Sequence, residues 1–140
     1  MGAWIAVRGS FGSEAILLCL ALLFWISGFD IIYATQDHAF DSRSGLHSLV
    51  VRFGIPRALN ISRLLHVAML GCLVALEVFY RLSWPFQTAL VIVAALLVYL
   101  HFFRRSASLD SLNQDFFAAN IAVSLVVFLG IAGSVFLPRV

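Results

Sequence analysis

Charge is scarce in this chain of 140 residues, and lysine is missing from it altogether. Only 11% of the residues are charged, 62% are hydrophobic, and the mean hydropathy is +1.01. These values are too apolar for a soluble globular domain of this length. The net charge of +2 is small, and the arginines form no patch of the kind that binds nucleic acid. We therefore expect a membrane protein without a nucleic-acid partner.

Cysteine is also rare, which limits the metal and redox chemistry that the chain can carry. The only two cysteines are Cys19 and Cys72, and both lie inside hydrophobic runs. Neither has a partner at the spacing of a metal-binding or redox motif. We expect both side chains to pack in the core.

Four hydrophobic runs are long enough to cross a bilayer, which takes about 20 residues in a helix. Their continuous apolarity predicts helices, because the strands of a membrane barrel would alternate apolar with polar residues. The predicted spans are residues 15–32, 61–80, 85–103 and 116–137. The sequence therefore predicts one all-α integral membrane domain over residues 1–140, with four transmembrane helices in contact with membrane lipid.

The arginines predict the orientation of these spans, because cytoplasmic loops carry the excess of positive charge. Six arginines fall in the first and third connections, and three fall in the second connection and the two ends. The six are Arg43, Arg52, Arg57, Arg63, Arg104 and Arg105, and the three are Arg8, Arg81 and Arg139. This distribution predicts a multi-pass protein with both ends outside and the first connection in the cytoplasm. We expect the membrane to be a bacterial inner membrane.

The stretch DIIYATQDHAFDSRSGLHS, residues 30–48, is unusually polar for this chain. If the first span continues as one helix through Asp41, then Asp30, Tyr33, Asp37 and Asp41 share an arc of about 80°. Asp37 and Asp41 are then neighbours one turn apart, and such a like-charge pair destabilises a helix by a few tenths of a kcal/mol. A bound divalent cation would offset this repulsion.

Magnesium suits this pair better than other metals do. Mg²⁺ is held by one or two carboxylates and completes its coordination with waters and phosphate oxygens. Zinc fits poorly because no cysteine joins the cluster. A calcium EF-hand is excluded because the alternating ligands and the final glutamate are missing.

The same aspartates could instead be solvated loop residues. The segment from Asp41 to Gly45 would pass for a turn, and the spacing alone does not separate the two interpretations. Asp30 favours a functional site, because an ionisable group at the edge of an apolar span is costly and is by default functional.

Polar residues in the other spans have simpler interpretations. Glu77 could pair with Arg81 on one helix surface. His66 and His101 are expected to be packed or interfacial. Asn120 could join two helices through hydrogen bonds.

The polar stretch resembles the second aspartate-rich motif of the UbiA superfamily of intramembrane prenyltransferases. The resemblance is specific from Asp30 to Gly54, and it is most similar to the 4-hydroxybenzoate polyprenyltransferase-like branch. It is carried by Asp30-x-x-Tyr33-x-x-x-Asp37-x-x-x-Asp41, then Gly45-Leu46-His47-Ser48 and Arg52-Phe53-Gly54. Looser similarity extends over nearly the whole chain.

The resemblance implies a fold and a reaction. The four spans would correspond to the C-terminal part of a UbiA-type helical bundle. The reaction is transfer of a polyprenyl group from its diphosphate to an aromatic acid, in ubiquinone or menaquinone biosynthesis. The acceptor would be 4-hydroxybenzoate or a dihydroxynaphthoate-type acid.

The resemblance also implies roles for individual residues. Asp37 and Asp41 would be the catalytic aspartates that hold Mg²⁺. Arg43 and His47 would contact the diphosphate of the substrate. Asp30 and Tyr33, which lie upstream, would support the site.

Family members usually have nine spans and an earlier motif of the form Asn-Asp-x-x-Asp-x-x-x-Asp, which this chain lacks. We therefore expect the chain to be inactive alone and to need a missing N-terminal half. The alternative is a small four-helix channel or transporter subunit, or a non-catalytic remnant of the enzyme.

Overall fold

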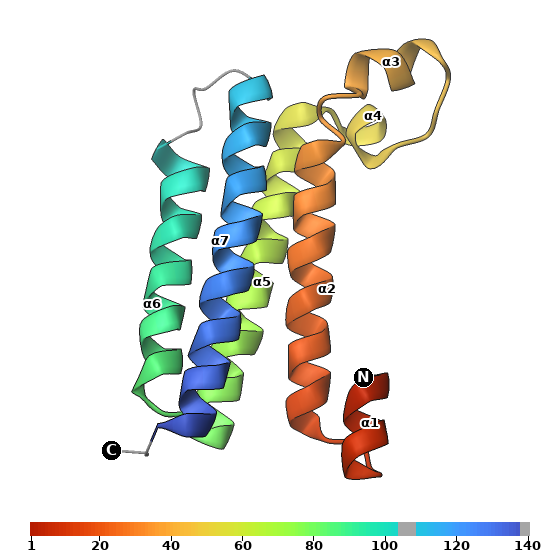
Figure 1. The fold of residues 1–140 in the computed structure, drawn as a ribbon. Helices are drawn as coiled ribbons and strands as arrows, with labels where there is room; N and C mark the ends of the chain where they lie inside the picture. Colours follow the sequence, from red (N-terminus) through yellow and green to blue (C-terminus); the bar gives the residue numbers. More distant parts are fainter. Residues whose placement is uncertain (104–108, 138–140) are drawn as a thin grey trace.

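The computed structural model describes residues 1–103 and 109–137, and every regular element in these residues is helical (Figure 1). The elements are α1 (Gly2–Arg8), α2 (Ser13–Tyr33), α3 (His38–Arg43), α4 (Leu49–Phe53), α5 (Ile55–Tyr80), α6 (Trp84–Val98), the π-helical turn η1 (Tyr99–Phe103) and α7 (Leu109–Phe136). Within the described residues, four helical stretches are long and apolar enough to span a membrane: Ser13–Tyr33, Ile55–Tyr80, Trp84–Phe102 and Gln114–Phe136. The predicted all-α multi-pass membrane fold is confirmed.

One difference from the predicted spans is at the start of α5, which begins at Ile55 rather than at residue 61. Gly54 has φ of 77°, a conformation that suits glycine, and it turns the chain directly into the helix. Pro56 occupies the first turn of α5, where its missing N–H leaves no hydrogen bond unmade. Pro85 takes the same position in α6. Backbone geometry at Gly54 therefore extends a helix into a stretch that hydropathy alone assigns to a loop.

The four long helices form an upright bundle in which consecutive spans run in opposite directions (Figure 1). α2 packs against α5 along much of its length, and α6 packs against α7 in the same way. The short helices α3 and α4 lie at one end of the bundle, and the N-terminus and the end of α7 lie at the other. The first connection therefore gathers Arg43, Arg52 and Arg57 at the same end as the aspartates. Arg104, Arg105 and Arg139 lie outside the described residues.

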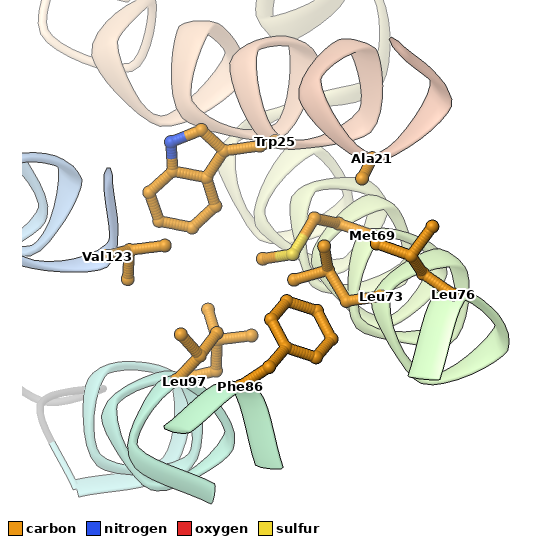
Figure 2. Packing of buried hydrophobic residues seen from close by; sticks show 9 residues of the cluster. Ala21, Trp25, Met69, Leu73, Leu76, Phe86, Leu97 and Val123 are labelled. Atoms are coloured by element: carbon orange, nitrogen blue, oxygen red, sulfur yellow. The ribbon is translucent and has the colours of Figure 1, made fainter. Parts of the chain in front are cut away.

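All four long helices contribute to the central apolar core. Figure 2 shows Trp25 of α2, Met69 and Leu73 of α5, Phe86 and Leu97 of α6 and Val123 of α7 pointing toward one another. Phe86 is completely buried, and the other five are at most 7% exposed. Cys72 packs against this core as expected, and Cys19 is half-buried. The core holds the bundle together below the end that carries the polar stretch.

Two buried polar side chains of α5 form hydrogen bonds to other helices, which satisfies groups that find no water in a lipid environment. Ser62 donates a hydrogen bond of 2.8 Å to the carbonyl oxygen of Gly28, and this joins α5 to α2. Nδ1 of His66 and Nε2 of His101 are 2.8 Å apart, and this bond joins α5 to η1. The expectation that both histidines are packed is confirmed.

Glu77 does not pair with Arg81 as predicted. Its Oε1 accepts a hydrogen bond of 2.7 Å from Gln87 of α6 instead. Arg81 follows the end of α5 with φ of 45°, so its backbone leaves the helix. The helix ends before the side chain at the i+4 position can lie over Glu77.

The hydrogen bond between Trp25 and Asn120 offers a test of helix association. Nε1 of Trp25 donates to Oδ1 of Asn120 over 2.6 Å and so connects α2 to α7, as predicted for Asn120. We expect Trp25→Phe and Asn120→Leu to show a coupling energy of about 0.6–1.7 kcal/mol in a double-mutant cycle, the range measured for hydrogen bonds between membrane helices. Unfolding in detergent micelles measures this energy, and additive effects would contradict it.

Candidate functional site

The polar stretch is divided between two helices, so the condition that one helix continues from Asp30 through Asp41 is not met, and the four polar side chains do not share one arc. α2 ends at Tyr33, and two tight backbone bonds follow, from Thr35 N to Ile32 O and from Gln36 N to Tyr33 O, both 3.1 Å. The hydroxyl of Thr35 is buried and donates to the carbonyl oxygen of Ile32 over 2.6 Å. A short polar side chain that bonds back to the backbone competes with the helix, and this ends α2.

Asp37 and Asp41 nevertheless stay one turn apart, because Asp37 is the N-cap residue of α3 and Asp41 lies in its first turn. Asp37 is the residue that precedes the helix, and its carbonyl oxygen accepts a bond of 2.8 Å from the Asp41 backbone N–H. Asp37 is exposed and Asp41 is half-buried. The carboxylate of Asp37 makes no capping hydrogen bond to the described backbone of α3. Both carboxylates therefore remain available at the end of the bundle.

Asp30 and Tyr33 lie in the last turn of α2, immediately before this helix. Asp30 is exposed, and Tyr33 is 53% exposed. The Tyr33 ring stacks on Phe29, with the ring centres 6.3 Å apart. These two residues are separated from Asp37 and Asp41 by the turn after α2 and do not share a helix face with them.

Arg43 and His47 occupy different positions around α3. Arg43 is exposed in the last turn of α3, where a cation is favourable next to the helix carbonyl groups. His47 is exposed in the loop between α3 and α4, and it lines a hollow of about 680 Å³. Gly45, with φ of 66°, allows the sharp turn that brings this loop back toward α4. The structure places His47 in the wall of this hollow, and Arg43 is not among its described lining residues.

Residues of α4 that were predicted only as part of a motif also line this hollow. Arg52 and Phe53 belong to its wall together with the loop residues Leu46, His47 and Ser48. Ser48 caps α4 by accepting a hydrogen bond of 3.2 Å from the Val51 N–H. Serine is a preferred N-cap residue, so the sequence could have predicted this cap. It could not have predicted the cavity, which depends on how the loop folds back.

The carboxylates of Asp37 and Asp41 could supply some, but not all, of the ligands of a magnesium ion. In the residues that the structure describes, no group of three or more His, Cys, Asp or Glu side chains could hold a metal ion. Asp37 and Asp41 are two carboxylates on one helix, which is the number that Mg²⁺ takes from a protein when waters and phosphates supply its other ligands. The pair therefore fits one side of a shared magnesium–diphosphate site.

Comparison with known families agrees with this arrangement. The model of the UbiA prenyltransferase family matches residues 1–136. The chain belongs to the UbiA prenyltransferase family. The match includes the aspartate pair, the hollow and all four candidate spans.

Three relatives of this UbiA family chain are each named as an enzyme that transfers a prenyl chain to 4-hydroxybenzoate. The chain is 34% identical to a mitochondrial 4-hydroxybenzoate polyprenyltransferase of Aedes aegypti, over 91% of the chain and 29% of the relative. It is 32% identical to a 4-hydroxybenzoate octaprenyltransferase of Ectopseudomonas mendocina, over 92% of the chain and 43% of the relative. It is 29% identical to a 4-hydroxybenzoate solanesyltransferase of Synechocystis sp., over 91% of the chain and 44% of the relative. No solved structure gives a significant match.

The UbiA family chain thus spans less than half the length of these relatives. The aspartate pair at the end of a four-helix bundle is what this chain itself contributes. In the residues that the structure describes, no third His, Cys, Asp or Glu joins this pair to form a metal-binding group.

Proposed function

We propose that this chain supplies the second aspartate-rich motif of an intramembrane enzyme that transfers a polyprenyl group to an aromatic acid in quinone biosynthesis. The substrates are a polyprenyl diphosphate and an acid such as 4-hydroxybenzoate. The names of the relatives support this choice of acceptor over a dihydroxynaphthoate-type acid. Family membership also favours the enzyme over a channel or transporter subunit.

The observation that carries the proposal is the pair Asp37 and Asp41, one turn apart on α3. Both carboxylates are at the N-terminal end of α3, where the helix dipole favours negative charge, but they also repel each other across one turn of a short helix. Asp37 does not cap the described backbone of α3, although aspartate is well suited to that role. A shared cation gives a physical reason for both carboxylates.

Asp30 supports the same interpretation. It is in the last turn of α2, where the helix carbonyl groups disfavour a negative charge. The described last turn of α2 holds no basic residue to compensate. A cation bound nearby would stabilise Asp30, which we assign a supporting role together with Tyr33.

In the proposed reaction, the bond between the allylic carbon and the diphosphate oxygen breaks, and a bond forms from that carbon to a ring carbon of the acid. The ring then loses a proton, which the released diphosphate takes up, and becomes aromatic again. Mg²⁺ would neutralise charge on the departing diphosphate. Asp37 and Asp41 would hold that ion, while Arg43 and His47 would contact the diphosphate oxygens. The apolar spans keep water away from the carbocation.

We propose further that the remaining ligands and spans come from an N-terminal half that carries the first aspartate-rich motif. The complete enzyme would lie in a bacterial inner membrane. The aspartates, Arg43 and Arg52 would face the cytoplasm, because the arginine-rich end is the cytoplasmic end. Reading the DNA upstream of the Met1 codon, and searching native membranes for its peptides by mass spectrometry, tests whether such a half is encoded there.

A binding experiment tests the metal–diphosphate role directly. The chain is reconstituted in lipid nanodiscs and titrated with Mn²⁺, a paramagnetic substitute for Mg²⁺, in the presence of inorganic diphosphate. We expect bound Mn²⁺ to be detected by electron paramagnetic resonance. Asp37→Asn and Asp41→Asn should each weaken binding at least about tenfold, because each removes one of two charged ligands.

Glu14→Gln is the matched control, because Glu14 lies in the first turn of α2 at the opposite end of the bundle. It removes one negative charge without touching α3, and binding should be unchanged. Equal weakening by Glu14→Gln would indicate a nonspecific charge effect. Failure of the unaltered chain to bind Mn²⁺ with diphosphate would contradict the proposal.

A further inference from the structure

Two buried histidines inside the bundle have no role in the proposed reaction. His66 of α5 is 1% exposed and His101 of η1 is 9% exposed, and the 2.8 Å bond between Nδ1 and Nε2 joins their rings. Both lie in helical stretches that are long and apolar enough to span a membrane. An ionisable side chain in such a stretch is costly, and it is by default functional. Two apolar side chains would serve packing at least as well, so this histidine pair calls for a further role.

His66 packs directly against the backbone of α2 near the end of that helix. A Cβ atom at Gly28 would lie 2.6 Å from Nε2 and 2.8 Å from Cδ2 of His66, so the glycine makes room for the ring. The Trp25 ring, one turn earlier on α2, has its centre 4.8 Å from that of His66. Ser62, one turn before His66 on α5, donates its hydrogen bond to the carbonyl oxygen of Gly28. α5 therefore holds α2 at Gly28, two residues before Asp30.

His101 is itself fixed by the packing of η1 against α7 and α2. Its ring centre is 5.2 Å from that of Phe116 of α7, which is 1% exposed. The neighbouring Leu100 belongs with Phe116 and Ile32 to a second cluster of buried apolar side chains, and Ile32 lies in the last turn of α2. η1 is a π-helical turn, a form that is frequent at functional sites. Two adjacent residues of η1 thus act on the end of α2, Leu100 through the apolar cluster and His101 through His66.

We propose that His66 and His101 are positioning residues, whose hydrogen bond fixes the end of α2 and, through the tight turn that follows, the place of Asp37 and Asp41. A hydrogen bond has a set length and direction, so it selects one arrangement of α5 against η1. Apolar side chains of similar size would allow several arrangements, because well-filled cores lose uniqueness before they lose stability. The inference rests on the proposed function, since it concerns the geometry of the carboxylates that hold the metal ion. Neither imidazole contacts the metal or the diphosphate in this role.

Replacing both histidines with leucine separates positioning from stability. When both partners of a buried hydrogen bond become apolar groups of similar size, the free energy of unfolding can stay nearly unchanged. We therefore expect His66→Leu/His101→Leu to unfold in detergent micelles as the unaltered chain does. In nanodiscs it should bind Mn²⁺ with inorganic diphosphate about tenfold more weakly, the lower end of the loss that changes around metal ligands commonly cause. A role in packing alone would leave the binding unchanged.

His101→Gln tests whether the hydrogen bond itself is responsible. The glutamine amide can still bond Nδ1 of His66, so Mn²⁺ binding should stay close to that of the unaltered chain. Gly28→Ala is an independent variant in case the double variant misfolds. It keeps both histidines but forces α2 away from the His66 ring, and it should also weaken binding. Gly71→Ala is its matched control, because no described atom lies within 4 Å of the position of its Cβ, and its binding should be unchanged.

Hydrogen exchange, followed by mass spectrometry on the same samples without metal, separates the two proposals. In the double leucine variant, we expect the backbone amides of residues 30–44 to exchange faster, while those of residues 14–24 keep their rates. If a stable double variant binds Mn²⁺ with diphosphate as the unaltered chain does, the positioning role is wrong and the proposed function stands. Faster exchange in both segments would indicate general loosening and would also overturn the inference. If the unaltered chain does not bind Mn²⁺ with diphosphate, the proposed function fails, and exchange alone decides whether the histidine pair orders α3.

Discussion

Replacing Asp37 or Asp41 with alanine in the complete enzyme should lower the rate of polyprenyl transfer by about 10³-fold or more. Loss of a single preorganised group that stabilises transition-state charge commonly costs about 10²- to 10³-fold, and loss of a metal ligand also weakens the metal itself. The measurement is formation of prenylated 4-hydroxybenzoate by membranes that contain this chain together with a segment carrying the first aspartate-rich motif. Substrates are kept saturating so that the change reports the chemical step.

Gln36→Ala is the control for this prediction, because Gln36 is exposed and directly precedes Asp37. Its side chain carries no charge, and its backbone bond to Tyr33 is kept in the variant. Activity should therefore remain near that of the unaltered enzyme. Far-ultraviolet circular dichroism checks that the aspartate variants keep their helices. Normal turnover in a folded Asp37→Ala or Asp41→Ala enzyme would show that these carboxylates are ordinary loop residues.

Replacing Gly130 with alanine should destabilise the bundle by about 1–3 kcal/mol, the usual cost of forcing extra atoms into a packed interior. A Cβ atom at Gly130 would lie 2.6 Å from Cβ of Ala89 and 3.3 Å from the backbone oxygen of Pro85. Both atoms are fixed by the backbone of α6 and cannot move by side-chain rotation, so α6 and α7 would have to separate. Small residues at such positions let membrane helices approach closely. Thermal or denaturant unfolding in detergent micelles measures the effect.

Gly71→Ala is the matched control, because Gly71 is also a glycine inside a long helix. No described atom lies within 4 Å of the position that its Cβ would take. Alanine has a higher helix propensity than glycine, so this variant should be unchanged or stabilised by up to about 1 kcal/mol. Equal destabilisation by the two substitutions would mean that close approach of α6 and α7 is not what Gly130 provides.

Much of the candidate site could be predicted because it depends on residues that are near one another in the sequence. Asp37 and Asp41 lie close together because only one helical turn separates them, and the first turn of α3 is that turn. Asp30 does not lie on the same helix face as Asp37 and Asp41, because Thr35 bonds back to the carbonyl oxygen of Ile32 and α2 ends there. The known tendency of threonine to make such bonds was the available signal for this break.

Contacts between distant residues could not be predicted in the same way. His66 and His101 are each unremarkable in their own spans, and only the packing of α5 against η1 brings them together. The same is true of Trp25 and Asn120. Arg52 belongs to a sequence motif and to the arginines that predict the membrane orientation. Its place in the wall of the hollow, however, depends on the fold of the loop through Gly45.

The sequence by itself determined that this protein is a bundle of membrane helices and that two carboxylates lie one turn apart at its arginine-rich end. Hydropathy and helical periodicity are local properties, and the bilayer leaves a continuous apolar segment little alternative to a helix. Only the tertiary structure decided where α2 ends, which polar groups pair inside the bundle, and that α3, α4 and their loop border an open hollow with Arg52 in its wall. These features depend on contacts between segments far apart in the chain, and packing rather than composition selects among them.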